Sequence, residues 1–169
     1  MAGFVGLFAV RFVQGHIVNS HEFATRAMEL AEAEPDAAGQ AHLVMAGSLT
    51  SLGSLEEALS HFERARELSR GSVSLIIGTL PEVHALAWSS HADWLVGHQE
   101  RASTVCQEAV DLARASDHPY SLAVALGYAA TTYQLIGNRT RARDAASELI
   151  ETCQRYSFGF YGEWGVVVD

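Results

Sequence analysis

Apolar and small residues recur at helical spacing along nearly the whole chain, and alternation with a period of two is nowhere sustained. This pattern predicts an all-α protein. Polar residues at expected N-caps and the three prolines mark where helices begin. These markers are Asn19 with Glu22, Ser54 with Glu57, Asn138, Asp117 before Pro119, Pro35 and Pro81.

The markers divide the chain into antiparallel helix pairs. We expect helices over residues 3–17 and 20–33, 37–52 and 55–70, 81–96 and 99–115, and 119–136 and 139–156. The pairs therefore occupy residues 3–33, 37–70, 81–115 and 119–156, followed by a tail over 157–169. We expect one domain over residues 1–169.

The pairs read as copies of one pattern of small, glycine, small, large and small residues. Aligned on Ala24, Ala58, Ala102 and Ala142, they are separated by 34, 44 and 40 residues. The first interval equals the tetratricopeptide period. The five positions, at offsets 0, 7, 12, 16 and 19, are Phe12, Asn19, Ala24, Met28 and Ala31; Ala46, Gly53, Ala58, Phe62 and Ala65; Ser90, Gly97, Ala102, Cys106 and Ala109; and Ala130, Gly137, Ala142, Ala146 and Leu149.

Small residues at a helix crossing allow the axes to approach to about 8–10 Å, and a glycine can end a helix in the left-handed conformation. Each pair would leave one apolar face bare, so neighbouring pairs must stack. The pattern resembles that of tetratricopeptide repeats, and the resemblance implies a right-handed superhelix of helix pairs. The alternative is an irregular helical bundle whose spacing arises by chance.

The segments 95–102, 117–123 and 157–164 resemble the recurrent L-L-G-x-x-x-x-A, H-P-x-S-L-A and G-F-P-x-W motifs of a known class of helical arrays. These arrays form the C-terminal regions of large bacterial regulators, in which an ATPase is joined to a LuxR-type helix-turn-helix or a nucleotide cyclase. The resemblance implies signalling or transcription regulation in the cytoplasm. The chain departs from those regulators because it has neither a phosphate-binding loop nor a basic recognition helix.

Composition narrows the function classes. The chain of 169 residues has a formal net charge of −9 and contains no lysine, which argues against direct binding of nucleic acid or an anionic membrane. The apolar run from Ala2 to Val13 suggests a signal peptide, but Arg11 interrupts it and helical patterning continues, so we interpret it as a helix of the domain. The sequence contains no uninterrupted apolar stretch of about 18 residues, so no membrane span is expected.

The resemblance to tetratricopeptide arrays implies that the first helix of each pair lines a concave groove, which is expected to bind a protein segment, a peptide or a small effector. The residues expected there are Gln40, Leu43, Gly47, Thr50, His84, Ala87, Trp88, His91, Trp94, Leu95, Val124, Gly127, Tyr128, Thr131 and Gln134. The alternative is that Trp88 and Trp94 belong to the core, as aromatic residues at helical spacing usually do.

No cofactor, metal or catalytic site is expected. His84, His91 and His98 are spaced by seven residues, about 10 Å along a helix, and cannot share one ion unaided. Cys106 and Cys153 lack the spacing of a zinc or redox site and are expected to be buried thiols. No motif for a nucleophile or paired carboxylates occurs.

Two segments fit the repeat poorly. Residues 71–80 are too apolar for a solvated loop and are expected to fold back on a helix face or cover the groove. The tail from Phe158 to Val168 is rich in aromatic residues, so we interpret it as part of a truncated array or a self-association surface; the alternative is a capping helix. We therefore predict a noncatalytic interaction or sensing module, with a structural homo-oligomerisation unit as the alternative.

Overall fold

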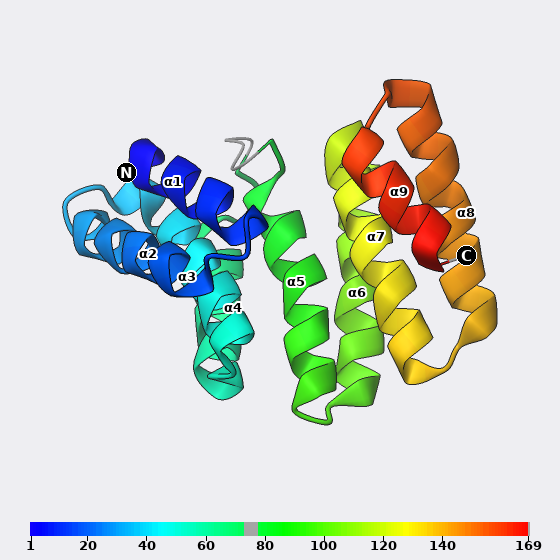
Figure 1. The fold of residues 1–169 in the computed structure, drawn as a ribbon, viewed down its shortest axis with the longest axis horizontal. Coiled ribbons are helices and arrows are strands. Elements are labelled where there is room, and N and C mark those ends of the chain that lie inside the picture. Colours follow the sequence, from blue (N-terminus) through cyan, green and yellow to red (C-terminus); the bar gives the residue numbers. More distant parts are fainter. Residues whose placement is uncertain (73–77, 169) are drawn as a thin grey trace. The chain divides into compact units, whose positions relative to one another are not determined.

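A computed structural model describes residues 1–72 and 78–168. Every regular element of these residues that is longer than one turn is an α-helix, which confirms the predicted class (Figure 1). The helices are α1 (Ala2–Val13), α2 (Ile17–Ala31), α3 (Ala38–Leu52), α4 (Leu55–Leu68), α5 (Pro81–Leu95), α6 (Gln99–Ala115), α7 (Pro119–Ile136), α8 (Arg139–Tyr156) and α9 (Gly159–Val168), with a 3-10 turn, η1 (Pro35–Ala37), before α3.

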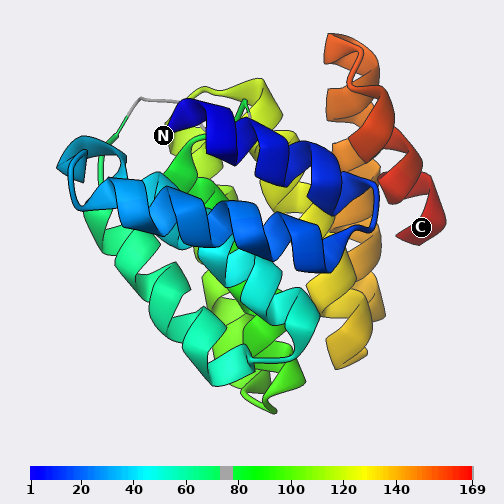
Figure 2. The same cartoon turned by 60° about the vertical axis from the view of Figure 1, so that its left-hand side comes forward.

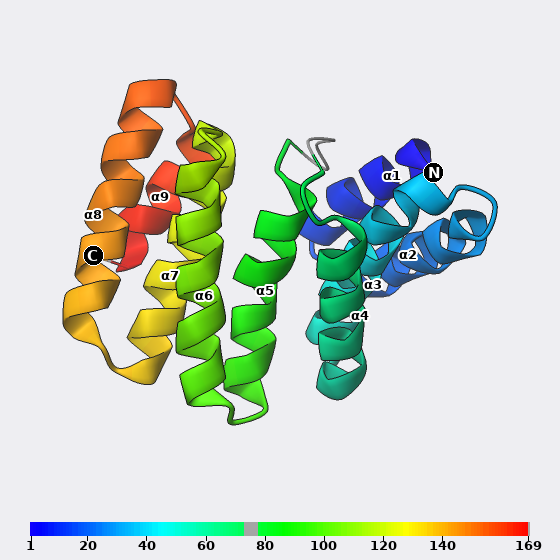
Figure 3. The same ribbon diagram turned by 180° about the vertical axis from the view of Figure 1, so that it is seen from behind.

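The contacts divide the chain into two compact units, Met1–Ala85 and a second unit that begins at Leu86. In the first unit, α1 packs on α2 and α3, and α2 and α4 pack on α3. Figure 2 shows α1 and α2 side by side. In the second unit, α6 packs on α7, α7 on α8, and α9 on both α7 and α8. Figure 3 shows the neighbouring α5 and α6 from behind. Both units thus have the helix-pair stacking of a repeat array, while the expectation of one domain remains a prediction.

Small buried side chains lie where the repeat pattern placed them. Ala46, Ala58 and Ala65 in the first unit are fully buried, as are Ser90 and Ala102 in the second. A larger side chain at any of these positions would hold the helices apart. In the second unit the crossing of α5 and α7 also carries a hydrogen bond, because the hydroxyls of Ser90 and Thr132 lie 2.9 Å apart and are both buried.

Three glycines end the first helix of a pair, as predicted. Gly53, Gly97 and Gly137 have φ values of 86°, 89° and 86°, in the left-handed region that costs other residues free energy. At Gly53 and Gly137 the glycine N–H and the following N–H bond to carbonyls of the last helical turn. The chain therefore reverses within two residues, which keeps the paired helices antiparallel.

The predicted register of the first copy is wrong by four residues. Gly15, with a φ of 78°, makes the turn, and Asn19 lies exposed inside α2 instead of capping it. Counting from Gly15 assigns the five pattern positions to Phe8, Gly15, Ser20, Ala24 and Ala27, and all but the glycine are buried. Ser20 therefore corresponds to Ala58, so the first interval is 38 residues and the match to the 34-residue period was a consequence of the wrong register.

The positions of the helix starts were predicted better than the hydrogen bonds that cap them. Asn138 caps α8, because its side chain accepts a hydrogen bond from the Arg141 N–H at 3.2 Å. Ser54 is the N-cap residue of α4, but its hydroxyl makes no capping bond, so the predicted capping box does not form. His118 rather than Asp117 caps α7, since its Nδ1 accepts from the Ser121 N–H at 3.2 Å.

The poorly fitting segments have different outcomes. Residues 73–77 lie outside the described residues, so the expectation that the apolar insertion covers a helix face or the groove stays a prediction. The tail forms α9, which packs on α7 and α8 in the second unit. A Cβ added to Gly165 would lie 2.9 Å from Ile150 Cγ1 and 3.4 Å from the Ala146 carbonyl oxygen. The absence of a side chain at Gly165 therefore lets α9 approach α8 closely.

The revised register is testable by two substitutions in α2. Ser20→Leu should lower the free energy of unfolding by about 1–3 kcal/mol, because it overfills a buried crossing. Asn19→Ala should leave it unchanged or slightly higher, because alanine is the better helix former. Urea denaturation of both variants measures this. A loss of about 1 kcal/mol in Asn19→Ala, which is typical of a lost N-cap, would restore the original register.

Candidate functional site

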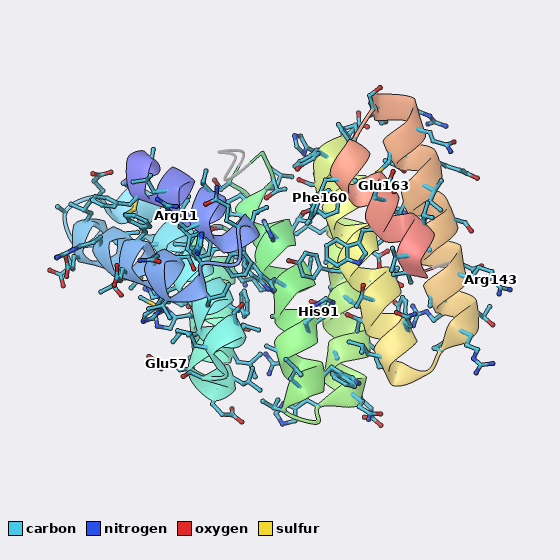
Figure 4. The ribbon with its side chains drawn as sticks, viewed as in Figure 1. Arg11, Glu57, His91, Arg143, Phe160 and Glu163 are labelled. Carbon is cyan, nitrogen blue, oxygen red and sulfur yellow. The ribbon has the colours of Figure 1, made fainter. Side chains whose placement is uncertain are left out.

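An aromatic cluster lies on the first helices of the second unit, where the sequence placed the groove. We call it the inner cluster and define it as Trp88 and His91 of α5, Tyr128 and Thr131 of α7, and Trp164 of α9. The Tyr128 ring lies 6.3 Å from Trp88, 4.8 Å from His91 and 5.2 Å from Trp164 between centroids. Figure 4 shows His91 on α5.

Hydrogen bonds fix the cluster on both sides. Trp164 Nε1 donates to Thr131 Oγ1 at 2.9 Å, and His91 Nε2 lies 3.3 Å from the Tyr128 carbonyl oxygen. The second contact requires the His91 proton on Nε2, because a carbonyl can only accept. The three helices therefore hold the rings in one orientation, which lowers the entropy cost of binding a partner.

Close approach of α9 also depends on Gly127 of α7. A Cβ there would lie 3.3 Å from Tyr161 Cδ1 and 3.6 Å from Trp164 Cε3. Gly127 was expected to line the groove. In the structure two aromatic rings of α9, those of Tyr161 and Trp164, pack against it. The glycine beside Tyr128 therefore allows α9 to pack against α7.

The cluster is uncharged near neutral pH. Burial lowers the pKa of His91 to about 4, although the bond to Tyr128 opposes the shift. Burial also raises the pKa of Tyr128 well above 10, and it raises the pKa of the neighbouring Tyr161. An apolar or aromatic group therefore suits this surface better than a charged one.

The remaining predicted groove residues differ in how deeply they are buried. His84 is buried, with its Nδ1 2.9 Å from Thr79 Oγ1, and Trp88 is also buried. Trp94 is half-buried, and its Nε1 is buried without a hydrogen-bond partner. Gln134 is exposed at the end of α7. Gln40 is half-buried in the first unit, so only the residues of the second unit are brought together here.

Trp164 belongs to the inner cluster but was not among the predicted groove residues. The tail was interpreted as an incomplete repeat or a self-association surface, so its side chains were not counted among groove residues. The available signal was the resemblance of residues 157–164 to the start of a further repeat. A first helix of a fifth pair would lie beside α7, and α9 does pack there (Figure 1).

A buried carboxylate, Asp93, was also missed. It is fully buried at the end of α5, 3.2 Å from Arg101 Nε and 3.5 Å from His98 Nδ1. Burial raises the pKa of Asp93, while the charge of Arg101 opposes that shift. Because all three residues flank the turn between α5 and α6, we interpret the group as a clamp on that turn rather than a catalytic site.

The first unit contains a histidine pair between α3 and α4. His42 Nδ1 and His61 Nδ1 lie 2.9 Å apart, so only one of them can carry the shared proton. Burial lowers the pKa of His42 to about 4 and also lowers that of His61. Within residues 1–72 and 78–168, no three His, Cys, Asp or Glu side chains gather in an arrangement that could hold a metal ion.

Comparison with solved structures identifies the fold. A Podosopora anserina protein described as a kinesin light chain with nearly identical TPR-like repeats superposes with a TM-score of 0.65. The match covers 90% of this chain and 74% of that chain at 12% sequence identity. The chain therefore has a tetratricopeptide-like helical repeat fold, and at this identity the likeness extends to the fold alone.

No family model matches the chain, and no curated protein matches it. None of the helices in the described part of the chain combines the length and apolar character needed to cross a bilayer.

One buried and two half-buried histidines predict acid sensitivity. His84, His91 and His42 have pKa values of about 4 in the folded protein against an ordinary 6.5, so between these values the unfolded chain binds more protons. The free energy of unfolding should therefore fall as the pH is lowered from 6.5 to 4, by about 3 kcal/mol for a fully buried ring. Chemical denaturation at a series of pH values measures this.

Replacing one ring should flatten that dependence. His91→Gln should reduce the slope of stability against pH, whereas Gln154→Ala on the exposed surface of α8 should keep the wild-type slope. An unchanged slope in His91→Gln would show that His91 does not titrate with a lowered pKa.

Proposed function

We propose that the chain is a noncatalytic interaction module whose inner cluster binds a segment of a partner protein. The observation that carries this proposal is the convergence of aromatic side chains from α5, α7 and α9 on one face of the second unit. Aromatic side chains supply large contact areas at low entropy cost and dominate many protein interfaces. The rings contribute no charge near pH 7, so the partner is recognised through an apolar or aromatic anchor.

Polar groups around the rings supply the rest of the recognition. Gln134 is exposed one helical turn beyond Thr131 on α7, where its amide suits the backbone of a bound segment. Trp94 adds a buried indole N–H that lacks an acceptor. With a net charge of −9, the chain favours a partner segment with basic residues around its anchor.

A peptide fits this surface better than a small effector. The apolar hollow that contains Trp164 has a volume of about 470 Å³, but all its lining residues, Gly159, Phe160, Glu163, Trp164 and Val167, come from the single helix α9. A small-molecule pocket usually buries most of its ligand between several elements. A hollow along one helix instead suits an extended or helical segment that continues beyond it.

The finer assignment, to a bacterial signalling or transcription regulator of the cytoplasm, rests on the motif resemblance of residues 95–102, 117–123 and 157–164. We propose it on that support. The genomic sequence around the coding region tests it: an ATPase, helix-turn-helix or cyclase module joined to this array is the expected finding. A different class of module joined to it would contradict the assignment.

Binding can be tested with fluorescein-labelled peptides of 12 residues, each with one aromatic or leucine anchor between arginines, by fluorescence anisotropy. Trp94→Ala and Gln134→Ala should each weaken the tightest peptide about fivefold or more, the effect of losing roughly 1 kcal/mol at an interface. The melting temperature should change little, because both side chains are at least partly exposed.

Glu57→Ala is the control, since Glu57 is exposed on α4 in the first unit (Figure 4), and it should leave the affinity unchanged. A large loss of stability in Trp94→Ala would show that Trp94 belongs to the core. Equal affinity of wild type and both variants would place the binding surface elsewhere.

A further inference from the structure

Among the described residues, α1 and α9 each expose an apolar face that carries one charge. On α9 the side chains of Phe160, Val166 and Val167 are 66%, 62% and 82% exposed. Glu163 is also exposed and is the only charged residue of the helix. At 100° per residue it lies at the centre of this face, between Phe160 and Val167 on one side and Val166 on the other. We call this surface the α9 face.

The second surface, the α1 face, has the opposite charge. Leu7, Val10 and Val13 of α1 are 47%, 55% and 75% exposed. Arg11 is exposed next to them and is the only charged residue of α1. Figure 4 shows Arg11 on α1 and Glu163 on α9.

The α1 face can also be approached closely. Nothing lies within 4 Å of the positions that a Cβ would take at Gly3 and Gly6, and both residues are exposed. A helix packed against this side of α1 would meet a smooth surface with Leu7 and Val10 as its ridge, which is the surface pattern that allows short interaxial distances.

Within each unit, the contacts of the described residues leave these faces uncovered. The opposite side of α1, with the buried Val5 and Phe8, packs on α2 and α3, and the side of α9 that contains Gly165 packs on α8. By contrast, the exposed side of α4 carries Glu56, Glu57, Glu63 and Glu67, as a solvated helix should. Exposed apolar patches on a helical repeat usually mark interaction surfaces.

We propose that the α9 face of one copy binds the α1 face of a second copy. In this contact the hollow of about 470 Å³ beside Phe160, Trp164 and Val167 receives apolar side chains of α1 such as Leu7 and Val10, so self-association and binding of a partner segment compete for it. Arg11, which now donates to Gln14 Oε1 at 3.3 Å, pairs with Glu163 across the contact.

Charge decides between this pairing and the symmetric ones. Two α9 faces would bring Glu163 against Glu163, and two α1 faces would bring Arg11 against Arg11, in surroundings that are otherwise apolar. Like charges opposed across an interface are disfavoured, and opposite charges fix the choice of partner. Only the pairing of α1 with α9 places opposite charges together, so the contact is head-to-tail and can repeat along a chain of copies or close into a ring.

The contact is small, because the helices have 12 and 10 residues. Interfaces well below the standard size form weak, reversible complexes, so we expect a dissociation constant on the order of 100 µM. Sedimentation equilibrium of the full chain between 5 and 500 µM should therefore show a mass-average mass that rises with concentration.

Charge reversal tests the pairing. Arg11→Glu and Glu163→Arg should each weaken association about tenfold or more, because each places like charges in the contact. An equimolar mixture of the two variants should associate again, since every α1–α9 contact between the two different chains pairs Arg with Glu. Arg11→Gln and Glu163→Gln should weaken association less than the reversals do.

The controls change net charge by the same amounts elsewhere. Arg143→Glu matches Arg11→Glu, and Glu57→Arg matches Glu163→Arg; both lie on exposed helix surfaces (Figure 4) and should associate like the wild type. Circular dichroism confirms that each variant is folded. A wild-type monomer at all concentrations would overturn the proposal. So would loss of association in Glu163→Arg but not in Arg11→Glu, which indicates paired α9 faces, or a mixture of the two reversals that stays monomeric.

Discussion

The helices of each pair approach closely because small side chains are buried where they cross. Where Ala58, Ala102 and Ala142 lie, a larger residue would separate the two helices of a pair, and the next pair would lose the surface on which it stacks. The left-handed glycines at the turns support the same packing. A longer turn would shift the small residues of the two helices out of register. The close approach of the helices therefore brings the side chains of the inner cluster together, and the hydrogen bonds of Trp164 and His91 then fix their orientation. The clamp of Asp93 and Arg101 secures one turn, and it does so within a geometry that the small residues have already fixed.

The sequence predicted most of this architecture, and its errors have physical causes. Eight of the nine α-helices in the described residues were expected within a few residues of their observed bounds, because their apolar spacing and their turn glycines agree. The first copy was misplaced because Asn19 and Glu22 imitate a capping box, whereas Gly15 makes the turn through its backbone conformation, which composition does not reveal. The capping box at Ser54 also failed: the residue types fit, but the Ser54 side chain makes no capping hydrogen bond. Local signals of this kind locate a helix start more reliably than they identify the atoms that hold it.

The candidate site was harder to predict than the fold, because exposure depends on which neighbour covers a helix. Spacing alone placed His84, Trp88 and His91 on one side of α5, and it could not show that His84 and Trp88 are buried. Spacing also could not show that Trp164 of α9 completes the cluster. That contact depends on Gly127 and Gly165, which have no side chain to hold the helices apart. Glycines that make room for a neighbouring helix do not recur in a pattern that the sequence reveals. They become informative only when the helix that occupies the space is known.

The distribution of charge separates the two kinds of surface in this chain. The inner cluster is apolar and has no charged group among its rings, so its specificity must come from shape and from a few hydrogen-bonding groups at its rim. The α1 and α9 faces are also apolar, yet each holds a single charge within or beside its exposed strip. A charge in such a place weakens nonspecific association, because burying it without a partner costs free energy. It also discriminates between partners, because only a face with the opposite charge removes that cost. Arg11 and Glu163 therefore have a stronger physical rationale as selectors of a partner than as contributors to the stability of the units in which they lie.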